Sequence, residues 1–553
     1  MARPVNGAST AGRWGLLGLG LLIGAAATVG LIYGVTLWVG TAAAGEAGAA
    51  PVFEAVDSGL DHVYDGEFEH YVGGGLAVLD CNDDGLPDVY VAGGSGPAGL
   101  YVNESEPGGD LVFEVDPNAT TDLTGVTGAY PIDIDSDQLG DLVVLRRGEN
   151  VVLRGLGDCS FEDATEVLGV AAGDHWTVGF SAFWDDANVL PTLAFGNYLE
   201  MDSTPNDQRC ADHFLIAPLD DESYAEPQTL SPGYCTLSIL FSDWGRTGSP
   251  DLRMTNDRHY YTDGSDQLWA MSDLPAEYTS ADGWRQLEIW GMGIASQDLD
   301  ADGFPEVYLT SQGDNKLQTL ADTSGAPAYE DIALATGVTA HRPFAGDTLR
   351  PSTAWHAEFD DTNNDGFVDL FVTKGNVEDQ VDFAAEDPNN LFLGQPDGTF
   401  VEGAEPAGLL DMARSRGGAV VDLNLDGFLD VVVVERREPV KVWRNSGRLS
   451  DGTPAGSWLL IDLEQSGPNT DTIGGWIEVE ADRHSVSKEV TIGGGHASGE
   501  SGWTHFGLGG ADQVRVRVVW PDGEVSDWER LDGNQMIKWN RATGPEVWTI
   551  SAN

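Results

Sequence analysis

The chain has 553 residues, which is enough for several hydrophobic cores. Its hydrophobic content of 41% is ordinary for a globular protein and excludes a disordered acidic chain. Its 90 acidic residues outnumber its 28 Lys and Arg residues, so the net charge is −62. Because a surface this acidic repels nucleic acid, we exclude a nucleic-acid partner.

The N-terminus has the features of a membrane-targeting segment. Arg3 and Arg13 precede an uncharged run from Trp14 to Gly40. This run is longer than the apolar part of a secretory signal, which spans about 7–15 residues, and it reaches the roughly 20 residues that a bilayer span needs. Positive flanks stay inside the cell, so the chain beyond Gly40 is predicted to lie outside.

We therefore expect residues 1–40 to form one N-terminal transmembrane helix, an uncleaved signal-anchor that holds the protein to the membrane through residues 14–40. The alternative is a signal helix that is cleaved near Ala42–Ala44, which would release a secreted protein. In both cases the predicted location is the cell surface or the extracellular or periplasmic side of the membrane.

The four cysteines all follow this segment, in agreement with an exported chain. Cys210 and Cys235 flank an insertion rich in Asp, Pro and Glu, and a disulfide between them would leave Cys81 and Cys159 as the second pair. Four cysteines allow three connectivities, and buried free thiols are the remaining alternative.

A nine-residue pattern recurs along the middle of the chain. In Asp80–Asp88, oxygen-bearing side chains occupy positions 1, 3, 5 and 9, and Gly85 occupies position 6. Alternate side chains of such a loop turn inward around a hard cation, and the glycine makes the tight bend. Four further copies follow, one of which has Gln138 in place of the glycine.

These five loops predict about five Ca²⁺ sites. The predicted metal ligands are Asp80, Asn82, Asp84, Asp88, Asp133, Asp135, Asp137, Asp141, Asp298, Asp300, Asp302, Glu306, Asp361, Asn363, Asp365, Asp369, Asp422, Asn424, Asp426 and Asp430.

Two other interpretations fit the loops less well. An EF-hand has Glu at position 12 and helices on both sides, whereas position 12 here is Val91 in the first loop and Val or Leu in the others, within runs of β-forming residues. Acidic turns without metal use the same residue types. Five copies with one spacing argue against plain turns, since carboxylates packed this closely repel one another unless a cation lies among them.

The spacing of the loops predicts the fold. Two worn copies, at 184–192 and 243–251, keep the apolar flanks but lack part of the ligand set. With them, loop starts recur every 51 to 63 residues, which gives seven units of several short strands each. Such units indicate an all-β fold, a seven-bladed β-propeller with Ca²⁺-binding loops inside its blades. An open β-solenoid, which has shorter and more uniform repeats, is the rival.

The regular spacing stops after Asn445. A Gly/Ser/Pro-rich connector follows, and then come apolar runs that predict a small C-terminal β domain. These runs are Trp458–Leu463, Ile473–Val479, Glu489–Ile492, Thr504–Leu508 and Val514–Trp520. The predicted organisation is a helix over 1–40, a linker over 41–51, a propeller over 52–445, and the connector and β domain over 446–553.

The five loops and the apolar strands after them resemble the FG-GAP/VCBS repeats of integrin α-like propellers. The end of the chain resembles the ASPIC/UnbV domain, through Trp458–Leu463, Gly467–Gly474, Gly493–Ser498, His505–Gly509 and Val519–Gly523. A propeller followed by this domain is the arrangement of the cartilage acidic protein family. The resemblance implies an extracellular calcium-binding propeller used for contacts with other molecules, and it implies no catalytic residues.

Two functions therefore remain open. The first is a surface or secreted binding or adhesion module for an extracellular protein or glycan. The second is an exported carbohydrate-active hydrolase or lyase that uses the propeller's central pocket, although no metalloprotease, nucleophile-elbow or phosphate-loop motif occurs. A Ser/His/acid site formed by His496 or His505 with Ser498 and Glu500 is a weaker hypothesis. Acidic and aromatic residues that converge on the propeller axis would favour the enzyme, whereas residues spread over an outer rim would favour the binding module.

Overall fold

The computed structural model describes residues 48–549, apart from residues 118–119, 171–172, 186–187, 258–263, 272–273, 322–324, 340–350, 378–382, 385–386 and 482–483. The predicted N-terminal helix over 1–40 lies outside these residues. Within them, no helix combines the length and the apolar character that a membrane span requires.

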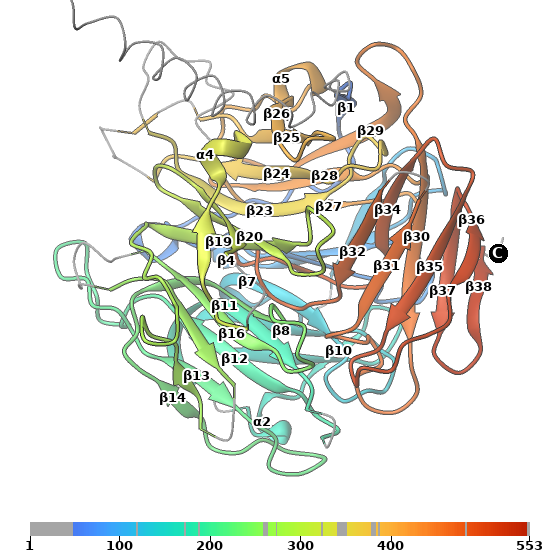
Figure 1. Ribbon diagram of the computed structural model, residues 1–553. Helices are drawn as coiled ribbons and strands as arrows, with labels where there is room; N and C mark the ends of the chain where they lie inside the picture. Colours follow the sequence, from blue (N-terminus) through green and yellow to red (C-terminus); the bar gives the residue numbers. More distant parts are fainter. Residues whose placement is uncertain are drawn as a thin grey trace, which may run out of the picture. The chain divides into compact units, whose positions relative to one another are not determined.

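The described part of the chain is built from strands, as predicted (Figure 1). Its helical segments are single turns at the ends of strands. They are η1 (Phe68–His70), α2 (Thr165–Leu168), α4 (Ala333–Thr336) and α5 (Ala404–Ala407).

Residues 51–449 form antiparallel runs of four strands, and the described residues contain seven such runs. The first run is β2 (Leu76–Leu79), β3 (Asp88–Val91), β5 (Gly99–Asn103) and β6 (Phe113–Asp116); the second is β7 (Thr124–Ile132), β8 (Asp141–Glu149), β9 (Val151–Gly155) and β10 (Phe161–Asp163); and the third is β11 (Asp174–Phe183), β12 (Thr192–Asn197), β13 (His213–Ile216) and β14 (Gln228–Leu230). The fourth run is β15 (Thr236–Ser242), β16 (Asp251–Asn256), β17 (Gln267–Ala270) and β18 (Ala276–Glu277), and the fifth is β19 (Gly291–Gln297), β20 (Glu306–Ser311), β21 (Lys316–Leu320) and β22 (Tyr329–Asp331). The sixth run is β23 (Ala354–Asp360), β24 (Asp369–Lys374), β25 (Asn390–Gly394) and β26 (Phe400–Glu402), and the seventh is β27 (Ser415–Val421), β28 (Asp430–Glu435) and β29 (Lys441–Leu449) with β1 (Pro51–Val56). The second and third runs are joined through β8 and β11, and β4 (Gly94–Pro97) pairs with β7.

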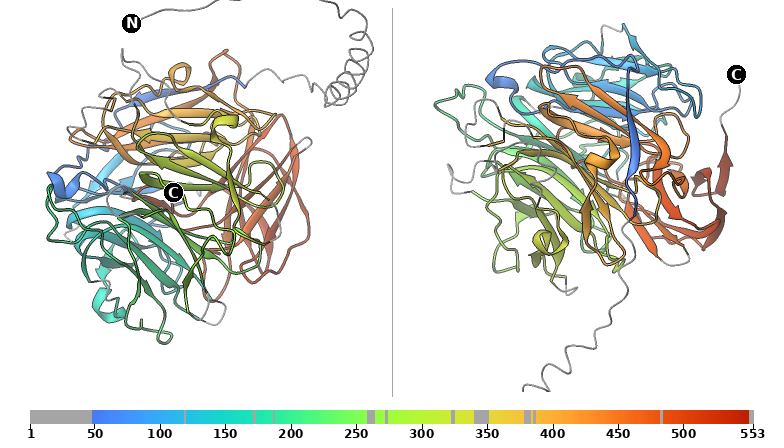
Figure 2. Two further views of the ribbon diagram at one scale, coloured as in Figure 1. Left: turned by 60° about the vertical axis from the view of Figure 1, so that its left-hand side comes forward. Right: turned by 90° about the horizontal axis from the view of Figure 1, so that it is seen from above.

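The last run takes its outermost strand from the start of the chain. Strand β1 pairs antiparallel with β29, with Phe53 opposite Asn445 and Val56 opposite Val442. In Figure 2 the blue strand β1 lies beside the orange strands of residues 415–449. The two ends of the repeat region are therefore joined in one sheet.

The inner strands of these runs are buried on both faces. Val89, Val91 and Leu100 of the first run are fully buried, as are Val431 and Val433 of the last. A four-stranded sheet cannot cover both of its faces alone, so each run depends on its neighbours. The core clusters combine residues of successive runs accordingly.

The C-terminal region, residues 457–548, forms two further four-stranded sheets. One consists of β34 (Thr504–Gly509), β30 (Ser457–Glu464), β37 (Gln535–Asn540) and β38 (Gly544–Trp548), and the other of β32 (Ser485–Glu489), β31 (Trp476–Glu480), β35 (Gln513–Val519) and β36 (Glu529–Asp532). Their shared core includes Ile461, Ile477 and Val516. The strand predicted over Glu489–Ile492 is wrong, because β32 ends at Glu489 and the chain then turns toward the repeat region.

A short piece of the C-terminal region, which we call the central segment (Ile492–Glu500), reaches the first strand of every run. On the first three runs, Ala77 of β2 pairs with Gly499, Ala129 of β7 donates its N–H to Ala497 O (3.3 Å), and the hydroxyl of Ser181 of β11 donates to Ile492 O. On the next three runs the segment is the donor. The N–H of Gly494 binds Ile239 O of β15 (2.7 Å), that of Gly495 binds Ile294 O of β19 (2.7 Å), and that of His496 binds His356 Nδ1 of β23 (3.2 Å). On β27, Gly417 has no side chain, and a Cβ there would lie 2.4 Å from Ser498 Oγ. The seven first strands therefore surround this segment.

Both disulfides have the predicted pairing. Cys81 is bonded to Cys159 and Cys210 to Cys235, and the chain has no free cysteine. Cys81 is position 2 of the first acidic loop, so its disulfide ties that loop to the outer part of the second run.

The close packing of the central segment predicts that a larger side chain beside it will lower the stability of the protein. A Cβ at Gly75 would lie 1.8 Å from Ala497 O, so Gly75→Ala must displace the segment, which we expect to cost about 1–3 kcal/mol. Thermal unfolding should begin at a temperature lower by a few degrees, and proteolysis within the connector should accelerate. Gly510→Ala is the matched control, because no atom lies within 4 Å of the position that its methyl group would take. Equal melting of the two variants would contradict this role of the segment.

Candidate metal loops and a cavity beneath the C-terminal region

Each acidic loop begins directly after the first strand of a run and ends on the first residue of the second strand. In the first loop, Asp80 accepts the backbone N–H groups of Asp84 (3.2 Å) and Gly85 (2.7 Å). Gly85 has φ 90°, a left-handed conformation that glycine adopts without strain. In the second loop Gln138 adopts φ 72° at the same position, so the frame persists there without a glycine.

The carboxylate at position 9 has a role that sequence reasoning missed. Asp88 accepts the N–H of Cys81 within its loop (2.9 Å) and that of Asn103 in the third strand (2.8 Å). Asp141, Asp369 and Asp430 make the equivalent pair of bonds. The carboxylate at position 9 therefore links its loop to the third strand of the same run by hydrogen bonds. A carboxylate oxygen has two lone pairs, so these bonds leave it able to bind a cation.

The remaining loop oxygens fit a cation. The carboxylates of Asp133, Asp135 and Asp141 each place an oxygen within 4.8 Å of the others, and a second such group consists of Asp298, Asp300 and Asp302. Three buried oxygens at positions 1 or 3 have no hydrogen-bond partner among the described residues. They are Asp135 Oδ1, Asp298 Oδ1 and Asn424 Oδ1. Unpaired buried oxygens of this kind are the ligands that Ca²⁺ prefers.

Burial makes the charges of these loops costly. Burial, together with a smaller contribution from neighbouring loop carboxylates, raises the pKa of Asp88 to about 7 and the pKa of Asp141 to about 8. The pKa of Asp422 rises to about 8 for the same two reasons. Carboxyl groups with such pKa values hold protons near neutral pH unless a positive charge compensates them. A divalent cation in the loop would supply that charge.

The worn loop at 243–251 has the same hydrogen-bonded backbone as the intact loops but lacks part of their predicted metal-ligand set. Asp243 still accepts the N–H groups of Thr247 (2.7 Å) and Gly248 (2.8 Å), as position 1 does elsewhere. Asp251 still accepts a backbone N–H, that of Met271 directly after the third strand (3.0 Å). Position 3, however, is Gly245, which offers no side-chain oxygen. The worn loop at 184–192 is described only in part.

Residues of the C-terminal region contact the acidic loops directly. Trp503 donates its indole N–H to Gly85 O (3.2 Å), and Asp471 accepts the N–H of Asp133 (3.0 Å). In the worn loop, Arg246 binds Glu478 and lies over the ring of Trp476, with its Cζ 3.9 Å from the ring centroid. Comparable contacts reach the other three intact loops, at Gln297–Ser487, Asn364–Gly509 and Gly427–Trp458. The face that holds the predicted metal ligands is therefore the face that the C-terminal region covers.

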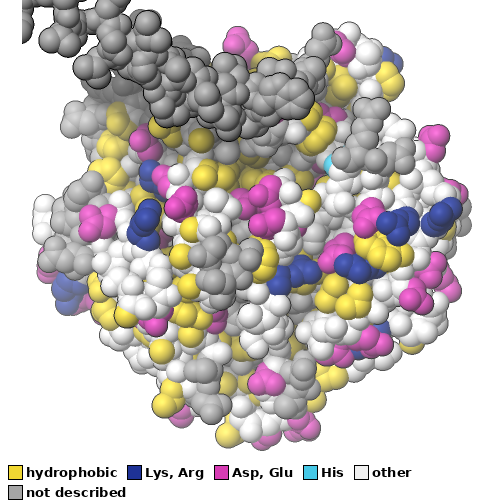
Figure 3. All heavy atoms as spheres, viewed as in Figure 1, with side chains coloured by type: hydrophobic (Ala, Val, Ile, Leu, Met, Phe, Trp, Pro, Cys, Tyr) yellow, Lys and Arg dark blue, Asp and Glu magenta, His cyan; other side chains and the backbone are white. Residues whose placement is uncertain are grey.

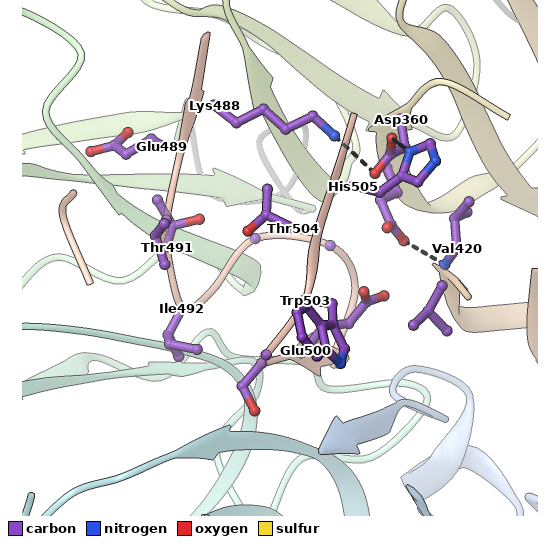
Figure 4. A pocket seen from close by; sticks show the side chains of 18 of the residues that line it. Asp360, Val420, Lys488, Glu489, Thr491, Ile492, Glu500, Trp503, Thr504 and His505 are labelled. Atoms are coloured by element: carbon purple, nitrogen blue, oxygen red, sulfur yellow. Dashed lines mark hydrogen bonds and ion pairs between the residues drawn. The ribbon is translucent and has the colours of Figure 1, made fainter. Parts of the chain in front are cut away.

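A cavity of about 520 Å³ lies where this covered face meets the central segment (Figure 4). From the repeat region its lining includes Glu358 and Asp360 of β23 and the edges of the loops at Asp80 and Asp422. From the C-terminal region it includes Lys488 and Glu489 of β32, Glu500 at the end of the central segment, Trp503, and His505 of β34. Acidic and aromatic residues thus converge on the point that the seven first strands surround. Figure 3 shows Asp and Glu side chains also scattered over the outer surface.

Asp360 is the best-compensated carboxylate of the cavity. Lys488 Nζ lies 2.9 Å from its Oδ2, and His505 Nδ1 lies 3.0 Å from its Oδ1. Glu358 and Glu500 are instead hydrogen-bonded to each other, and burial raises the pKa of both well above its usual range.

The hypothetical Ser/His/acid site does not assemble. Ser498 Oγ accepts the N–H of Leu76 and donates to His496 O (both 3.2 Å). His496 Nε2 accepts the N–H of Gly73 (3.2 Å), so His496 Nδ1 carries the proton and donates to Met292 O (3.2 Å). Burial lowers the pKa of His496 to about 3. Both side chains therefore serve to fix the central segment between strands.

Comparisons with known proteins agree with this division of the chain. A family model described as "ASPIC and UnbV" matches residues 465–546, and one described as "FG-GAP-like repeat" matches residues 361–433. The second match includes the loops that begin at Asp361 and Asp422.

The similar curated proteins are cartilage acidic proteins. Cartilage acidic protein 1 of Homo sapiens is 24% identical over 42% of this chain, and that of Xenopus tropicalis is 23% identical over 86% of this chain. The match covers 33% of the human protein, 34% of the mouse protein and 74% of the frog protein, so it spans about a third of the length of the two mammalian relatives.

Solved structures resemble the chain loosely. A structure of BBS1N in complex with ARL6DN covers 72% of this chain and 98% of its own, with a TM-score of 0.41 and 10% identity. A lectin of Agrocybe aegerita described as recognising non-reducing terminal N-acetylglucosamine covers 72% of this chain and 91% of its own, with a TM-score of 0.30 and 15% identity. At these scores we draw nothing from either structure.

Metal removal tests the loops. A cation that binds only the folded protein stabilises it by about 2.7 kcal/mol per site at a hundred-fold excess over Kd. We expect the melting temperature in low-salt buffer to rise clearly with added Ca²⁺ and to fall with EDTA. Asp300→Ala removes a position 3 ligand and should reduce the Ca²⁺-dependent rise.

The control for this measurement is Asp527→Ala, which removes an exposed carboxylate outside the loops and should melt like the wild type in both buffers. A wild-type melting curve that is the same in Ca²⁺ and EDTA would show that the loops hold no metal.

Proposed function

Since this chain is a relative of the cartilage acidic proteins, with FG-GAP-like and ASPIC and UnbV segments, we propose that it is an exported, calcium-stabilised binding protein for an extracellular protein or glycan. The observation that carries the proposal is the polar cavity between the C-terminal region and the first strands β15, β19, β23 and β27. Its volume of about 520 Å³ lies within the roughly 300–1,000 Å³ of small-molecule sites.

The proposed architecture is a closed seven-bladed propeller with a C-terminal β domain over one face. The seven four-stranded runs, the pairing of β1 with β29 and the central segment all support it. In this architecture the five intact loops hold about five Ca²⁺ ions, through the ligands predicted from the sequence. The worn loop at 243–251 makes side-chain contacts with the C-terminal region instead, such as that of Arg246 with Glu478.

The proposed location is outside the cytoplasm. Two disulfides support an oxidising compartment, because reducing conditions in the cytosol oppose such bonds. Attachment to the membrane through residues 14–40, or release after cleavage, remains part of the proposal and concerns residues outside the described range.

The ligand proposal follows from what the cavity offers. Trp503 provides an aromatic surface, and carboxylates together with the backbone of Gly493–Gly495 provide hydrogen-bonding groups. Sites for polar organic molecules combine these two features. A sugar residue at the end of a glycan, or a polar side chain of a protein, has the size and polarity to enter.

A hydrolase is a weaker second candidate. The pair Glu358 and Glu500 would be its natural acid and base, since their pKa values are strongly raised. Glycoside hydrolases, however, separate their two carboxyl groups by about 5–5.5 Å or 6.5–9.5 Å, whereas these two are in hydrogen-bonding contact. The contact favours binding over glycoside hydrolysis by this pair.

A glycan and protein binding screen in Ca²⁺ and in EDTA tests the proposal. We expect at least one class of ligand to bind in Ca²⁺, to lose most of its binding in EDTA, and to be recovered uncleaved. Trp503→Ala should weaken that binding, and Trp528→Ala, a tryptophan of the same region outside the cavity, should not. Binding that ignores both EDTA and Trp503→Ala would contradict the proposed site.

A further inference from the structure

The cavity contains more negative charge than its own cations compensate. The described Lys residues on its lining are Lys488 and Lys538, and each already pairs with a carboxylate, Asp360 at 2.9 Å and Asp462 at 3.4 Å respectively. An anionic ligand would therefore meet no available positive charge there. A ligand must be neutral or positive to enter.

Glu358 and Glu500 are two of the carboxyl groups that contribute this negative charge. Neither forms an ion pair with Lys or Arg within the described part of the chain. Glu358 Oε2 accepts the N–H of Val420 (3.0 Å) and lies 3.3 Å from His356 Nε2. His356 Nδ1 accepts the N–H of His496, so His356 Nε2 carries a proton and donates it to Glu358. These are neutral donors, and they leave the pair one positive charge short.

A second, independent observation concerns His505. Its side chain is 2% exposed and lines the cavity, yet its Nε2 has no hydrogen-bond partner among the described groups. Nδ1 donates to Asp360, so in the neutral ring Nε2 is an acceptor. A buried acceptor of this kind is costly unless a donor reaches it. The free groups of the cavity are thus acceptors, at Glu358, Glu500 and His505.

The size of the cavity distinguishes an organic donor from a bare ion. A metal ion alone would leave most of about 520 Å³ unfilled, and it would not use Trp503. An ammonium group has three donors, no acceptor and a positive charge, and an aromatic ring close to it adds cation–π attraction. Figure 4 shows Trp503 beside Glu500 on the cavity wall.

We propose that this cavity takes a small organic amine, such as an amino sugar, whose protonated amino group lies against Glu358 and Glu500 and whose remaining polar hydrogens reach His505 Nε2. This inference rests on the proposed binding function and specifies the chemical class of its ligand. The ammonium group donates hydrogen bonds to the two carboxyl groups, and the rest of the molecule occupies the space beside Trp503.

Three monosaccharides of similar size and different charge test this choice. Glucosamine, glucose and glucuronate are compared by ligand-observed NMR with the full chain in Ca²⁺, at matched pH and ionic strength. We expect glucosamine to bind about tenfold or more tightly than glucose, because a charge-assisted hydrogen bond contributes that much, and glucuronate not to bind. The series uses the wild-type protein, so it does not depend on the folding of any variant.

Variants then locate the site. Glu358→Gln combined with Glu500→Gln preserves shape, removes the charge, and should reduce glucosamine binding to the level of glucose. Glu330→Gln changes an exposed carboxylate on β22 and should leave the preference for glucosamine unchanged. Melting temperatures of both proteins in Ca²⁺ establish that they are folded.

The outcomes separate the inference from the proposed function. Equal binding of glucose and glucosamine overturns the amine inference and leaves a glycan cavity in place. Displacement of glucosamine by added Ca²⁺ also overturns the inference, because the carboxyl pair would then hold a metal ion. No binding of any of the three sugars overturns the cavity as a sugar site, and the inference with it.

Discussion

The removal of carboxylates from water on one face of the repeat region is the constraint on which the rest of the structure depends. Asp88, Asp141 and Asp422 lie in loops that are covered by protein, and burial raises their pKa values to about 7 or 8. Their oxygens accept backbone N–H groups wherever the loop allows, and the oxygens left over converge within each loop. Hydrogen bonds to neutral donors compensate only part of a buried charge, which is why we assign the remainder to Ca²⁺.

The same face is the platform for the C-terminal region, and this links the loops to the cavity. Trp503 and Asp471 bind two intact loops, and Arg246 binds the region from a worn one. The central segment, which belongs to this region, in turn lies between the seven first strands. A cation bound in a loop would therefore affect the cavity indirectly, by fixing the backbone that the C-terminal region contacts.

Much of this could be predicted from the sequence because it is local. The nine-residue spacing placed each loop between two strands of one run, and the Cys210–Cys235 and Cys81–Cys159 disulfides followed from the position of one insertion. Local pattern also misled once, since the apolar residues of Glu489–Ile492 predicted a strand where the chain leaves its sheet. Strands β37 and β38 were not anticipated, because their mixed residues lack a clear alternation.

The cavity could not be predicted because it depends on contacts distant in sequence. Glu358 and Glu500 meet only through the insertion of the central segment, and nothing near either residue indicates the other. The hydrogen bonds that position 9 makes to the third strand could not be predicted for a related reason. An aspartate that binds a cation and one that accepts the N–H of a neighbouring strand, as Asp88 does from Asn103, are the same residue in the sequence. Asn103 itself reaches Leu423 O in the loop of another run, which no spacing rule would indicate.

Hydrogen exchange of the central segment tests most directly whether the loops hold the C-terminal region in place. Exchange at residues 492–500 would be compared by mass spectrometry in Ca²⁺ and in EDTA, at a temperature where the strands of the repeat region remain protected. The account predicts slow exchange in Ca²⁺ and a marked loss of protection in EDTA, together with the loops. Loops that lose protection in EDTA while the central segment stays fully protected would contradict it.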